Sequence, residues 1–287
     1  MRFLATDLGN FTVKTSEGKE FNSSFNVLDA TDAVSKEVLT YNDTSYVMNQ
    51  ICPFDSQYNK ATKNYMPNLL WALEQSGAED QDEYNIILGL PISTIKQSEK
   101  LKADLSNKDF TYKVADKEKT IKIKTVGVVA EGISSFYMLP KEFRDKNVIL
   151  FDLGSRTCNV IEFVNGKPVK SKTIPMGTID FFGMVADEYN NNKGTNVETH
   201  RIFEYMKDGK IVPSKEVEDA FVSELMQKVL LDFSLDLADE RVFTGGGSIT
   251  LGQALLRYNK DFIFLENPRF SNVNGNAKIG KAKGLDK

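Results

Sequence analysis

The feature that most constrains the fold of this chain is a turn that occurs twice. The segments ATDLGNFTVK (5–14) and LFDLGSRTCN (150–159) both contain Asp-Leu-Gly followed, after two further residues, by Thr. The second copy begins about half of the 287-residue chain after the first, and each copy follows an apolar, strand-like segment. A turn repeated in the same context at this separation predicts two domains of similar plan.

The order of the other segments supports this division. Alternating residues predict strands, whereas apolar residues three or four positions apart predict helices. In the first half we expect a returning strand at 11–16, β-segments within 20–50, a helix from Asn59 that stops at Gly77, a strand at 85–91, a helix at 94–106, further strands up to Ala130 and a short helix that begins with Glu131. In the second half we expect a strand at 147–154, a hairpin over Asn165-Gly166, helices at 179–191, 195–208 and 214–236, and a helix near the end of the chain. Strands precede helices in both halves, which indicates an α/β fold with a boundary near Asp145.

Composition and charge argue against several functions. The net charge is −4, from 36 basic and 40 acidic residues, and the lysines are spread along the chain, which argues against direct non-specific binding to DNA. No apolar run approaches the roughly 18 residues of a membrane span, and the chain begins directly with a strand-like segment. We therefore expect a cytoplasmic protein without a membrane partner.

The cysteines and the histidine leave little room for thiol or imidazole chemistry. Cys52 and Cys158 are isolated and lack metal-site spacing, so we expect both to be structural thiols in a reducing compartment. His200 is the single histidine, which excludes a histidine-built metal site. No nucleophile elbow lies near it, so a Ser-His-Asp triad has no support either.

The repeated turn has a plausible chemical role. Its backbone N–H groups can cradle phosphate, and its glycine lets a ligand approach the backbone closely. The Asp at the strand end can hold a hydrated Mg²⁺. A single copy is better explained as an ordinary strand-to-turn signature, but two matching copies favour a clamp that grips a triphosphate from both sides.

A third glycine-rich element lies between an apolar strand and a helix, in VFTGGGSITLG. Such a turn can bring backbone against a flat nucleoside. It is not a P-loop, because no Gly-Lys-Ser/Thr follows, and it does not fit the dinucleotide pattern. The run Gly245-Gly246-Gly247 is weak evidence by itself.

Together these segments resemble the actin, heat-shock chaperone and sugar-kinase superfamily of ATPases. A first phosphate loop (ATDLGNFTVK), a connecting helix (VVAEGISSFY), a second phosphate loop (LFDLGSRTCNV), an adenosine turn (VFTGGGSITLG) and a second connecting helix (NVNGNAKIG) occur in the superfamily's order. Within it the chain is similar, nearly end to end, to plasmid-segregation actins of the ParM and AlfA type. The resemblance implies two ribonuclease-H-like domains flanking a nucleotide cleft: domain I at 1–145, domain II at 146–271, and a C-terminal helix at 272–287 that packs back on domain I.

The resemblance also implies roles for single residues. Asp7 and Asp152 correspond to the aspartates that face Mg²⁺, and Lys14 to the basic residue that reaches the phosphates. Glu131 corresponds to the carboxylate that orients or deprotonates the attacking water; the alternative is a helix-start acid, favourable at the positive end of a helix. The remaining nucleotide-binding positions are Gly9, Asn10 and Thr12 in the first loop, Gly154, Ser155, Arg156 and Thr157 in the second, and Gly245, Gly246, Gly247 and Ile249 in the adenosine turn.

Two departures from the family pattern stand out. The second loop carries Ser155 where a second glycine is common, and Arg156 adds a charge there. The segment 177–243 is short for an actin and has room for helices but little sheet. The outer lobe of the second domain is therefore expected to be reduced, as in AlfA-like members, which leaves the base-pocket contacts open.

The resemblance implies an ATPase, with ATP or GTP and Mg²⁺ as cofactors, whose chain assembles with itself into a filament and moves plasmid DNA through a centromere-binding adaptor of ParR type. Plasmid DNA would then be engaged only indirectly. The alternatives are a small-molecule kinase, a MreB-type cell-shape protein or a chaperone-like ATPase of the same fold. The chain shows no spare length for a kinase acceptor pocket, no substrate domain after the ATPase part and no membrane-binding element at MRFLATDLG.

Overall fold

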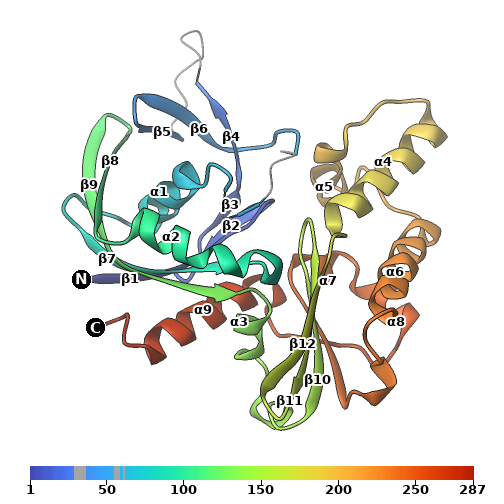
Figure 1. Ribbon diagram of the computed structural model, residues 1–287. Coiled ribbons are helices and arrows are strands. Elements are labelled where there is room, and N and C mark those ends of the chain that lie inside the picture. Colours follow the sequence, from blue (N-terminus) through green and yellow to red (C-terminus); the bar gives the residue numbers. More distant parts are fainter. Residues whose placement is uncertain (29–36, 55–58, 61) are drawn as a thin grey trace. The chain divides into compact units, whose positions relative to one another are not determined.

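The protein divides into two compact units in a computed structural model that describes residues 1–28, 37–54, 59–60 and 62–287 (Figure 1). Unit 1 comprises Met1–Ser134 with Asn272–Lys287, and unit 2 comprises Ser135–Ser271. The chain crosses between the units within helix α3 (Ile133–Phe136) and within helix α9 (Ser271–Ala282), the two segments that the sequence analysis interpreted as connecting helices. Unit 2 begins before Asp145, where the sequence analysis set the boundary. Phe136 already stacks on Phe163 of this unit's sheet, with 3.9 Å between ring centroids.

Unit 1 is built on a nine-stranded mixed sheet with the order β3-β2-β1-β7-β9-β8-β5-β6-β4. Its strands are β1 (Arg2–Leu8), β2 (Thr12–Thr15), β3 (Glu20–Asn22), β4 (Ser24–Val27), β5 (Val38–Tyr41), β6 (Thr44–Gln50), β7 (Glu83–Leu90), β8 (Lys108–Val114) and β9 (Lys117–Ala130). Its other helical segments are α1 (Met66–Gln75), the 3₁₀ helix η1 (Ile92–Gln97) and α2 (Ser98–Leu105). The long strand β9 pairs with β7 at one end and with β8 at the other, and so joins the inner strands to the outer ones (Figure 1).

Unit 2 is built on a five-stranded sheet with the order β12-β11-β10-β13-β14. Its strands are β10 (Asn147–Leu153), β11 (Cys158–Val164), β12 (Lys167–Ile174), β13 (Glu240–Thr244) and β14 (Ile263–Phe264). Its helices are α4 (Thr178–Lys193), α5 (Thr199–Lys207), α6 (Lys215–Leu230), α7 (Gly246–Thr250) and α8 (Gly252–Tyr258), with the 3₁₀ helices η2 (Lys141–Phe143), η3 (Leu235–Leu237) and η4 (Pro268–Phe270).

The same strand plan occurs in both units. In unit 1, β1 pairs antiparallel with β2, β2 antiparallel with β3, β1 parallel with β7 and β7 parallel with β9. In unit 2, β10, β11, β12, β13 and β14 repeat these pairings in the same order. Each Asp-Leu-Gly turn lies at the end of a strand, β1 or β10, that pairs antiparallel with one neighbour and parallel with the other, so the repeated sequence marks a repeated structure.

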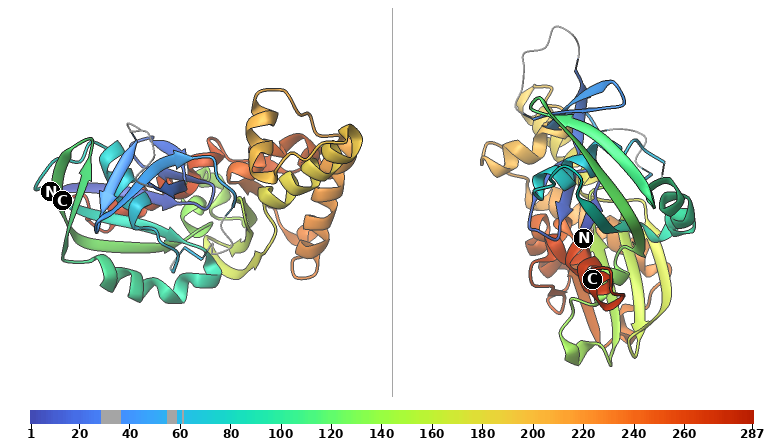
Figure 2. Two further views of the ribbon diagram at one scale, coloured as in Figure 1. Left: turned by 90° about the horizontal axis from the view of Figure 1, so that it is seen from above. Right: turned by 90° about the vertical axis from the view of Figure 1, so that its left-hand side faces the viewer.

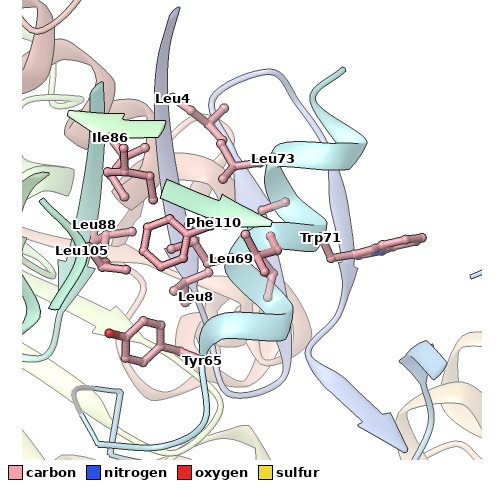
Figure 3. Close-up of a cluster of buried hydrophobic side chains, with 14 of the residues drawn as sticks. Leu4, Leu8, Tyr65, Leu69, Trp71, Leu73, Ile86, Leu88, Leu105 and Phe110 are labelled. Carbon is pink, nitrogen blue, oxygen red and sulfur yellow. The ribbon is translucent and has the colours of Figure 1, made fainter. Parts of the chain in front are cut away.

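The core of unit 1 lies between α1 and the sheet (Figure 3). Leu69 and Leu73 of α1 are fully buried with Leu4 of β1 and Ile86 of β7. The helix begins at Met66 rather than at Asn59, because Pro67 suits a first turn, and it stops before Gly77, whose φ of 78° ends the helix as predicted. Parts of two predicted segments, residues 29–36 of the β-region and residue 61, lie outside the described residues.

Aromatic stacking dominates the core of unit 2. Phe151 of β10 stacks on Phe243 of β13, with ring centroids 4.4 Å apart and planes 6° apart. The hairpin between β11 and β12 turns at Asn165 and Gly166, whose φ values of 48° and 73° are those of a type I′ turn. This confirms the hairpin predicted from the Asn-Gly pair.

Helix α9 packs on unit 1 through glycines. A Cβ at Gly275 would lie 1.9 Å from the carbonyl oxygen of Ser134, and a Cβ at Gly280 would lie 2.4 Å from the ring of Phe3. The side chain of Asn85 on β7 donates to the carbonyl oxygen of Leu285, 2.8 Å away. The last residues are thus held on the same sheet as β1, and the two chain ends lie close together (Figure 2).

The segment 177–243 is helical until β13 begins at Glu240, as its sequence predicts. Helix α6 ends earlier than predicted, at Leu230, and a 3₁₀ turn follows it. Within the ranges that the structure describes, no helix is long and apolar enough to cross a membrane.

Candidate functional site

The first Asp-Leu-Gly turn forms a tight reversal between β1 and β2. Asp7 on β1 lies opposite Lys14 on β2 in the antiparallel register. A Cβ at Gly9 would lie 2.2 Å from the carbonyl oxygen of Thr12, so glycine is required for this close approach. Because Gly9 has no side chain, nothing at this position covers the backbone of the turn.

A buried lysine links the two carboxylates that sequence analysis assigned to unit 1. The Nζ atom of Lys60 lies 2.8 Å from Oδ1 of Asp7 and also donates to Oε1 of Glu131. The side chains of all three residues are at most 13% exposed. Asp7 ends one strand, Glu131 follows another, and Lys60 comes from the loop before α1. Three distant segments thus meet in one charged cluster.

The charges in this cluster stabilise one another. Burial by itself would raise the pKa of Asp7, but the ammonium groups of Lys60 and Lys14 outweigh it and hold that pKa below its ordinary value. Burial would likewise lower the pKa of Lys60, but Asp7 and Glu131 outweigh it and raise that pKa. Asp7 and Lys60 therefore both favour their charged forms, and Lys60 lies between two carboxyl groups.

Glu131 lies in a turn rather than in a helix. Its N–H donates to the carbonyl oxygen of Leu90, 2.8 Å away, which continues the pairing of β9 with β7 by one residue. Gly132 follows with a φ of 76°, and α3 begins only at Ile133, with no acidic residue in its first turn. The prediction that Glu131 opens the helix is wrong, because the positive φ of Gly132 separates it from α3. The alternative interpretation, in which Glu131 is an acid at the start of a helix, is therefore wrong as well.

Two further lysines surround the first turn. Lys14 donates to Oγ1 of Thr12 at 2.8 Å. Lys63 donates to Oδ1 of Asn10 at 3.0 Å and to the carbonyl oxygen of Gly9 at 3.3 Å. With Lys60, three ammonium groups lie around a turn that carries Asp7. Lys60 is paired with Asp7 and Glu131, and Lys14 lies 3.9 Å from Glu20, so the lysines bring N–H donors for phosphate oxygens to the turn rather than an excess of positive charge.

The second Asp-Leu-Gly turn is braced against the start of α4. The N–H of Gly154 donates to the carbonyl oxygen of Thr157 at 2.9 Å. The carbonyl oxygens of Gly154 and Ser155 accept from the N–H groups of Thr178 and Ile179, at 3.1 and 2.9 Å. These bonds fix the backbone of the turn, which also includes Arg156. Asp152, at the end of β10, is 4% exposed.

The glycine run packs directly on the second turn. Gly245 has a φ of 84°, and a Cβ there would lie 2.4 Å from the carbonyl oxygen of Leu153 and 2.8 Å from Oδ1 of Asp152. A Cβ at Gly247 would lie 2.4 Å from Cγ of Leu153. Gly246 has open space around it. The structure thus joins two motifs that the sequence keeps about ninety residues apart, and it explains why two of the three positions require glycine. Ile249, on α7, is 58% exposed.

The sequence-predicted residues therefore form one set in each unit. Asp7, Gly9, Asn10, Thr12, Lys14 and Glu131 surround the first turn, whereas Asp152, Gly154, Ser155, Arg156, Thr157 and the glycine run with Ile249 surround the second. Sequence analysis missed Lys60, because an isolated lysine in a loop carries no local signal of a contact formed only by the fold.

Both sets of residues suit a magnesium ion that keeps several of its waters better than a metal ion that is coordinated by protein side chains alone. No group of three or more His, Cys, Asp or Glu side chains in the described part of the chain could enclose a metal ion. Mg²⁺ commonly keeps several waters and uses one or two carboxylates together with substrate phosphates. Asp7 in unit 1 and Asp152 in unit 2 are of this kind, and the ammonium of Lys60 demonstrates that the Asp7 carboxylate accepts a cation.

Comparison with known proteins identifies the fold. Residues 5–133 match the family described as "Actin like proteins N terminal domain". The archaeal actin homolog Ta0583 superimposes with a TM-score of 0.84 at 19% identity, over 98% of this chain and 100% of its own. Its complex with ADP superimposes with a TM-score of 0.82 at 18% identity, over 98% and 100% of the two chains. No curated protein sequence matches the chain at a significant level.

Plasmid actins have the same fold. A non-polymerisable quadruple mutant of pCBH ParM superimposes with a TM-score of 0.78 at 20% identity, over 98% of this chain and 99% of its own. The filament structure of AlfA from the B. subtilis plasmid pLS32 gives 0.64 at 17% identity, over 96% and 97% of the chains. Residues 5–133 thus match the N-terminal domain of actin-like proteins and the whole chain has the actin fold, which agrees with the resemblance inferred from the motifs.

Proposed function

We propose that this actin-like protein binds and hydrolyses ATP with Mg²⁺, assembles into filaments in the cytoplasm and moves plasmid DNA through a centromere-binding adaptor of ParR type. The observation that carries the proposal is the cluster in unit 1, where Lys60 bridges Asp7 and Glu131. These are the two carboxylates for which the sequence motifs imply contact with the metal and with the attacking water. If Lys60 served only to stabilise the fold through an ion pair, one of these two carboxylates would be enough.

Nucleotide binding is supported by features of both turns. The first turn contains a backbone position, Gly9, where only glycine fits, and it is surrounded by three lysines. The second turn is packed against Gly245, where a Cβ would also clash. Backbone N–H groups and ammonium groups are the usual ligands of phosphate oxygens. A solved relative, Ta0583, has a structure titled as a complex with ADP. We infer that the residues assigned above in the two turns bind the phosphates, and that Gly245 to Gly247 with Ile249 contact the nucleoside.

The chemistry would be attack of water on the terminal phosphate. Bound Mg²⁺, held through its waters by Asp7 and Asp152, would supply neutralisation of the phosphate charge. Lys14 would bind phosphate oxygens, and Glu131 would orient the water and accept its proton. Lys60, which donates to Glu131, would hold that carboxyl group in position.

The proposal that the chain forms filaments rests on its solved relatives. The proposal that it reaches DNA indirectly rests on its net charge. Solved relatives include an AlfA filament and a ParM mutant described as non-polymerisable. The chain itself has a net charge of −4, which is unfavourable for wrapping or sliding along DNA. We therefore infer that the chain assembles with itself and reaches DNA through a basic adaptor protein.

The decisive experiment follows assembly and hydrolysis in one sample. Purified protein is mixed with Mg²⁺ and either ATP or GTP, and light scattering is recorded together with phosphate release. We expect scattering to rise promptly with one or both nucleotides, phosphate to follow, and EDTA to suppress both. Electron micrographs taken with a non-hydrolysable ATP analogue should contain filaments. A protein that hydrolyses ATP only when a small-molecule acceptor is added, and never scatters, would be a kinase instead.

The DNA part of the proposal has its own test. We expect little binding of the pure protein to random duplex DNA at about 150 mM salt, measured by fluorescence anisotropy. Tight binding that resists salt, without any adaptor, would overturn the adaptor model while leaving the ATPase proposal intact.

A further inference from the structure

Asn276 occupies a fixed position on α9. The preceding residue, Gly275, lies so close to Ser134 that a Cβ would come within 1.9 Å of its carbonyl oxygen. One turn earlier, Oδ1 of Asn272 accepts from the N–H of Gly132 at 2.9 Å and from the hydroxyl of Ser134 at 3.0 Å. These contacts tie α9 to the residues that follow Glu131, so the helix can neither slide nor rotate freely there.

The carboxamide of Asn276 is buried without hydrogen bonds. The residue is 0% exposed, and neither Oδ1 nor Nδ2 has a hydrogen-bond partner among the described residues. Leaving a buried polar group unpaired opposes folding, and this side chain has two such atoms. A leucine, which has the same branching and equally many non-hydrogen side-chain atoms, would avoid the cost. Stability therefore gives no reason for an asparagine at this position.

Glu131 is the functional neighbour of this amide. A Cβ placed on Gly89 of β7 would lie 3.4 Å from Nδ2 of Asn276, 3.4 Å from Cγ of Glu131 and 3.6 Å from its Oε1. The amide nitrogen and the carboxylate thus lie over the same glycine.

We propose that Asn276 is a positioning residue for Glu131, whose carboxamide N–H donates to the Glu131 carboxylate, directly after rotation of the amide or through one buried water, when nucleotide is bound. This rests on the proposed ATPase function. Lys60 holds one oxygen of Glu131, and a second donor from the opposite element fixes the plane of the carboxylate. A general base acts efficiently only when its lone pair is aligned with the proton that it accepts.

The proposal predicts opposite effects on activity and on stability. Asn276→Leu removes both unpaired polar atoms and keeps the branching and the number of non-hydrogen atoms of the side chain, so the midpoint of thermal unfolding, Tm, should stay the same or rise by about 2–6 °C. The same change removes a donor to a charged group in the transition state. We expect kcat to fall by about 10- to 100-fold, with the dissociation constant of the nucleotide within about threefold of wild type.

Asn85 provides a matched control. It is also a buried asparagine of unit 1 and lies on β7, the strand that carries Gly89, but its Nδ2 donates to the carbonyl oxygen of Leu285. Asn85→Leu should therefore lower Tm by several degrees and leave kcat within about twofold of wild type. Asn276→Ser, which keeps a short donor, should retain more activity than Asn276→Leu.

Three quantities are measured on each purified variant: Tm without nucleotide, the nucleotide dissociation constant, and kcat by phosphate release. A lower Tm with normal kcat in Asn276→Leu would make Asn276 a structural residue and overturn the proposal. Equal losses of kcat and nucleotide affinity would overturn it as well. If wild-type protein releases no phosphate, the proposed function fails, whereas hydrolysis by wild type that Asn276→Leu matches refutes the role of Asn276 alone.

Discussion

The Nζ atom of Lys60 lies 2.8 Å from Oδ1 of Asp7, although the two residues are more than fifty positions apart in the sequence. The same ammonium also donates to Glu131. Both contacts are buried, so the desolvation of each charge is offset only while its partners remain. This makes the cluster sensitive to the loss of any one member.

Replacing Lys60 by Met tests this sensitivity. The variant keeps an apolar side chain of similar length but leaves two carboxylates buried without the ammonium. We expect the free energy of unfolding at pH 7 to fall by about 3–5 kcal/mol, the usual cost of removing one partner of a buried ion pair. Urea unfolding followed by circular dichroism measures the loss. As a control, Lys102→Met breaks an exposed pair with Glu99 and should cost less than about 1 kcal/mol.

The cost of Lys60→Met should depend on pH. In wild type, burial acts to raise the pKa of Asp7, but the lysine charges lower it overall. The resulting stabilisation is present above the unfolded-state pKa of about 3.8 and is lost as pH falls through the folded-state pKa. In the variant the folded-state pKa of Asp7 rises, so the variant gains stability as pH falls. The difference between the two proteins should shrink from pH 7 to about pH 4, and a constant difference would contradict this account.

Asp152→Ala tests the second turn. Asp152 is buried at the end of β10 beside Gly245, and we propose that it holds the waters of Mg²⁺. Titration with a fluorescent nucleotide should give binding at least about tenfold weaker than wild type, a change of about 1.4 kcal/mol. Removing Mg²⁺ should weaken wild type but change the variant little. Wild-type binding, hydrolysis and assembly in the variant would exclude Asp152 from the site.

Two adjacent glycines provide a test with its own internal control. Alanine at Gly245 would be strained at a φ of 84° and would clash with the carbonyl oxygen of Leu153, so we expect a loss of at least about 2 kcal/mol in unfolding free energy, together with weaker nucleotide binding. Alanine at Gly246 meets open space in the first turn of α7 and should be neutral or slightly stabilising. Equal effects of the two substitutions would show that the packing of Gly245 on Leu153 is unimportant.

Much of this fold follows from local sequence signals. The Asp-Leu-Gly turns, the Asn165-Gly166 hairpin and the stop at Gly77 each depend on a few neighbouring residues, and each is present in the structure. The length of α6 depends less on neighbouring residues and more on contacts with other parts of the fold. The sequence analysis extended this helix to residue 236, but it ends at Leu230, which is 50% exposed. Its buried face includes Val222 and Met226, because packing against α4 and α8 decides which side of the helix is covered.

The candidate site was also predictable only in part, because some of its contacts join residues that are far apart in the sequence. The family resemblance of the motifs pointed to Asp7 and Glu131, which lie at or just after the ends of recognisable strands. Lys60 and Asn276 carry no such signal: one is a lysine in a loop, and the other a polar residue in a helix of small residues. Their relation to Glu131 arises from contacts that only the folded chain brings together.

The two cysteines should be dispensable for activity. Cys158 is buried on β11, and burial raises the pKa of its thiol, which keeps it protonated and unreactive. Cys52 donates to Oδ1 of Asn26. A Cys52→Ser, Cys158→Ala double variant should lose about 1–2 kcal/mol of stability at most and keep wild-type phosphate release. Loss of turnover in a folded double variant would indicate thiol chemistry.

Glu131→Gln separates catalysis from binding. Glutamine keeps the size of the side chain and can still accept from Lys60, whereas alanine would leave a cavity beside a buried ammonium. A neutral amide takes up no proton from the attacking water, so kcat should fall by about 10²–10⁴-fold while nucleotide binding stays close to that of wild type. Such a variant should still assemble with ATP.

The fate of the assembled variant gives the sharper result. If hydrolysis drives disassembly, filaments of Glu131→Gln should persist far longer than those of wild type, because their nucleotide remains a triphosphate. Phosphate release and light scattering, followed over time in the same sample, measure both properties. Normal phosphate release would refute the catalytic assignment of Glu131. Failure to assemble despite normal nucleotide binding would instead give the Glu131–Lys60 pair a role in stabilising the conformation that assembles, since that pair is what the substitution weakens directly.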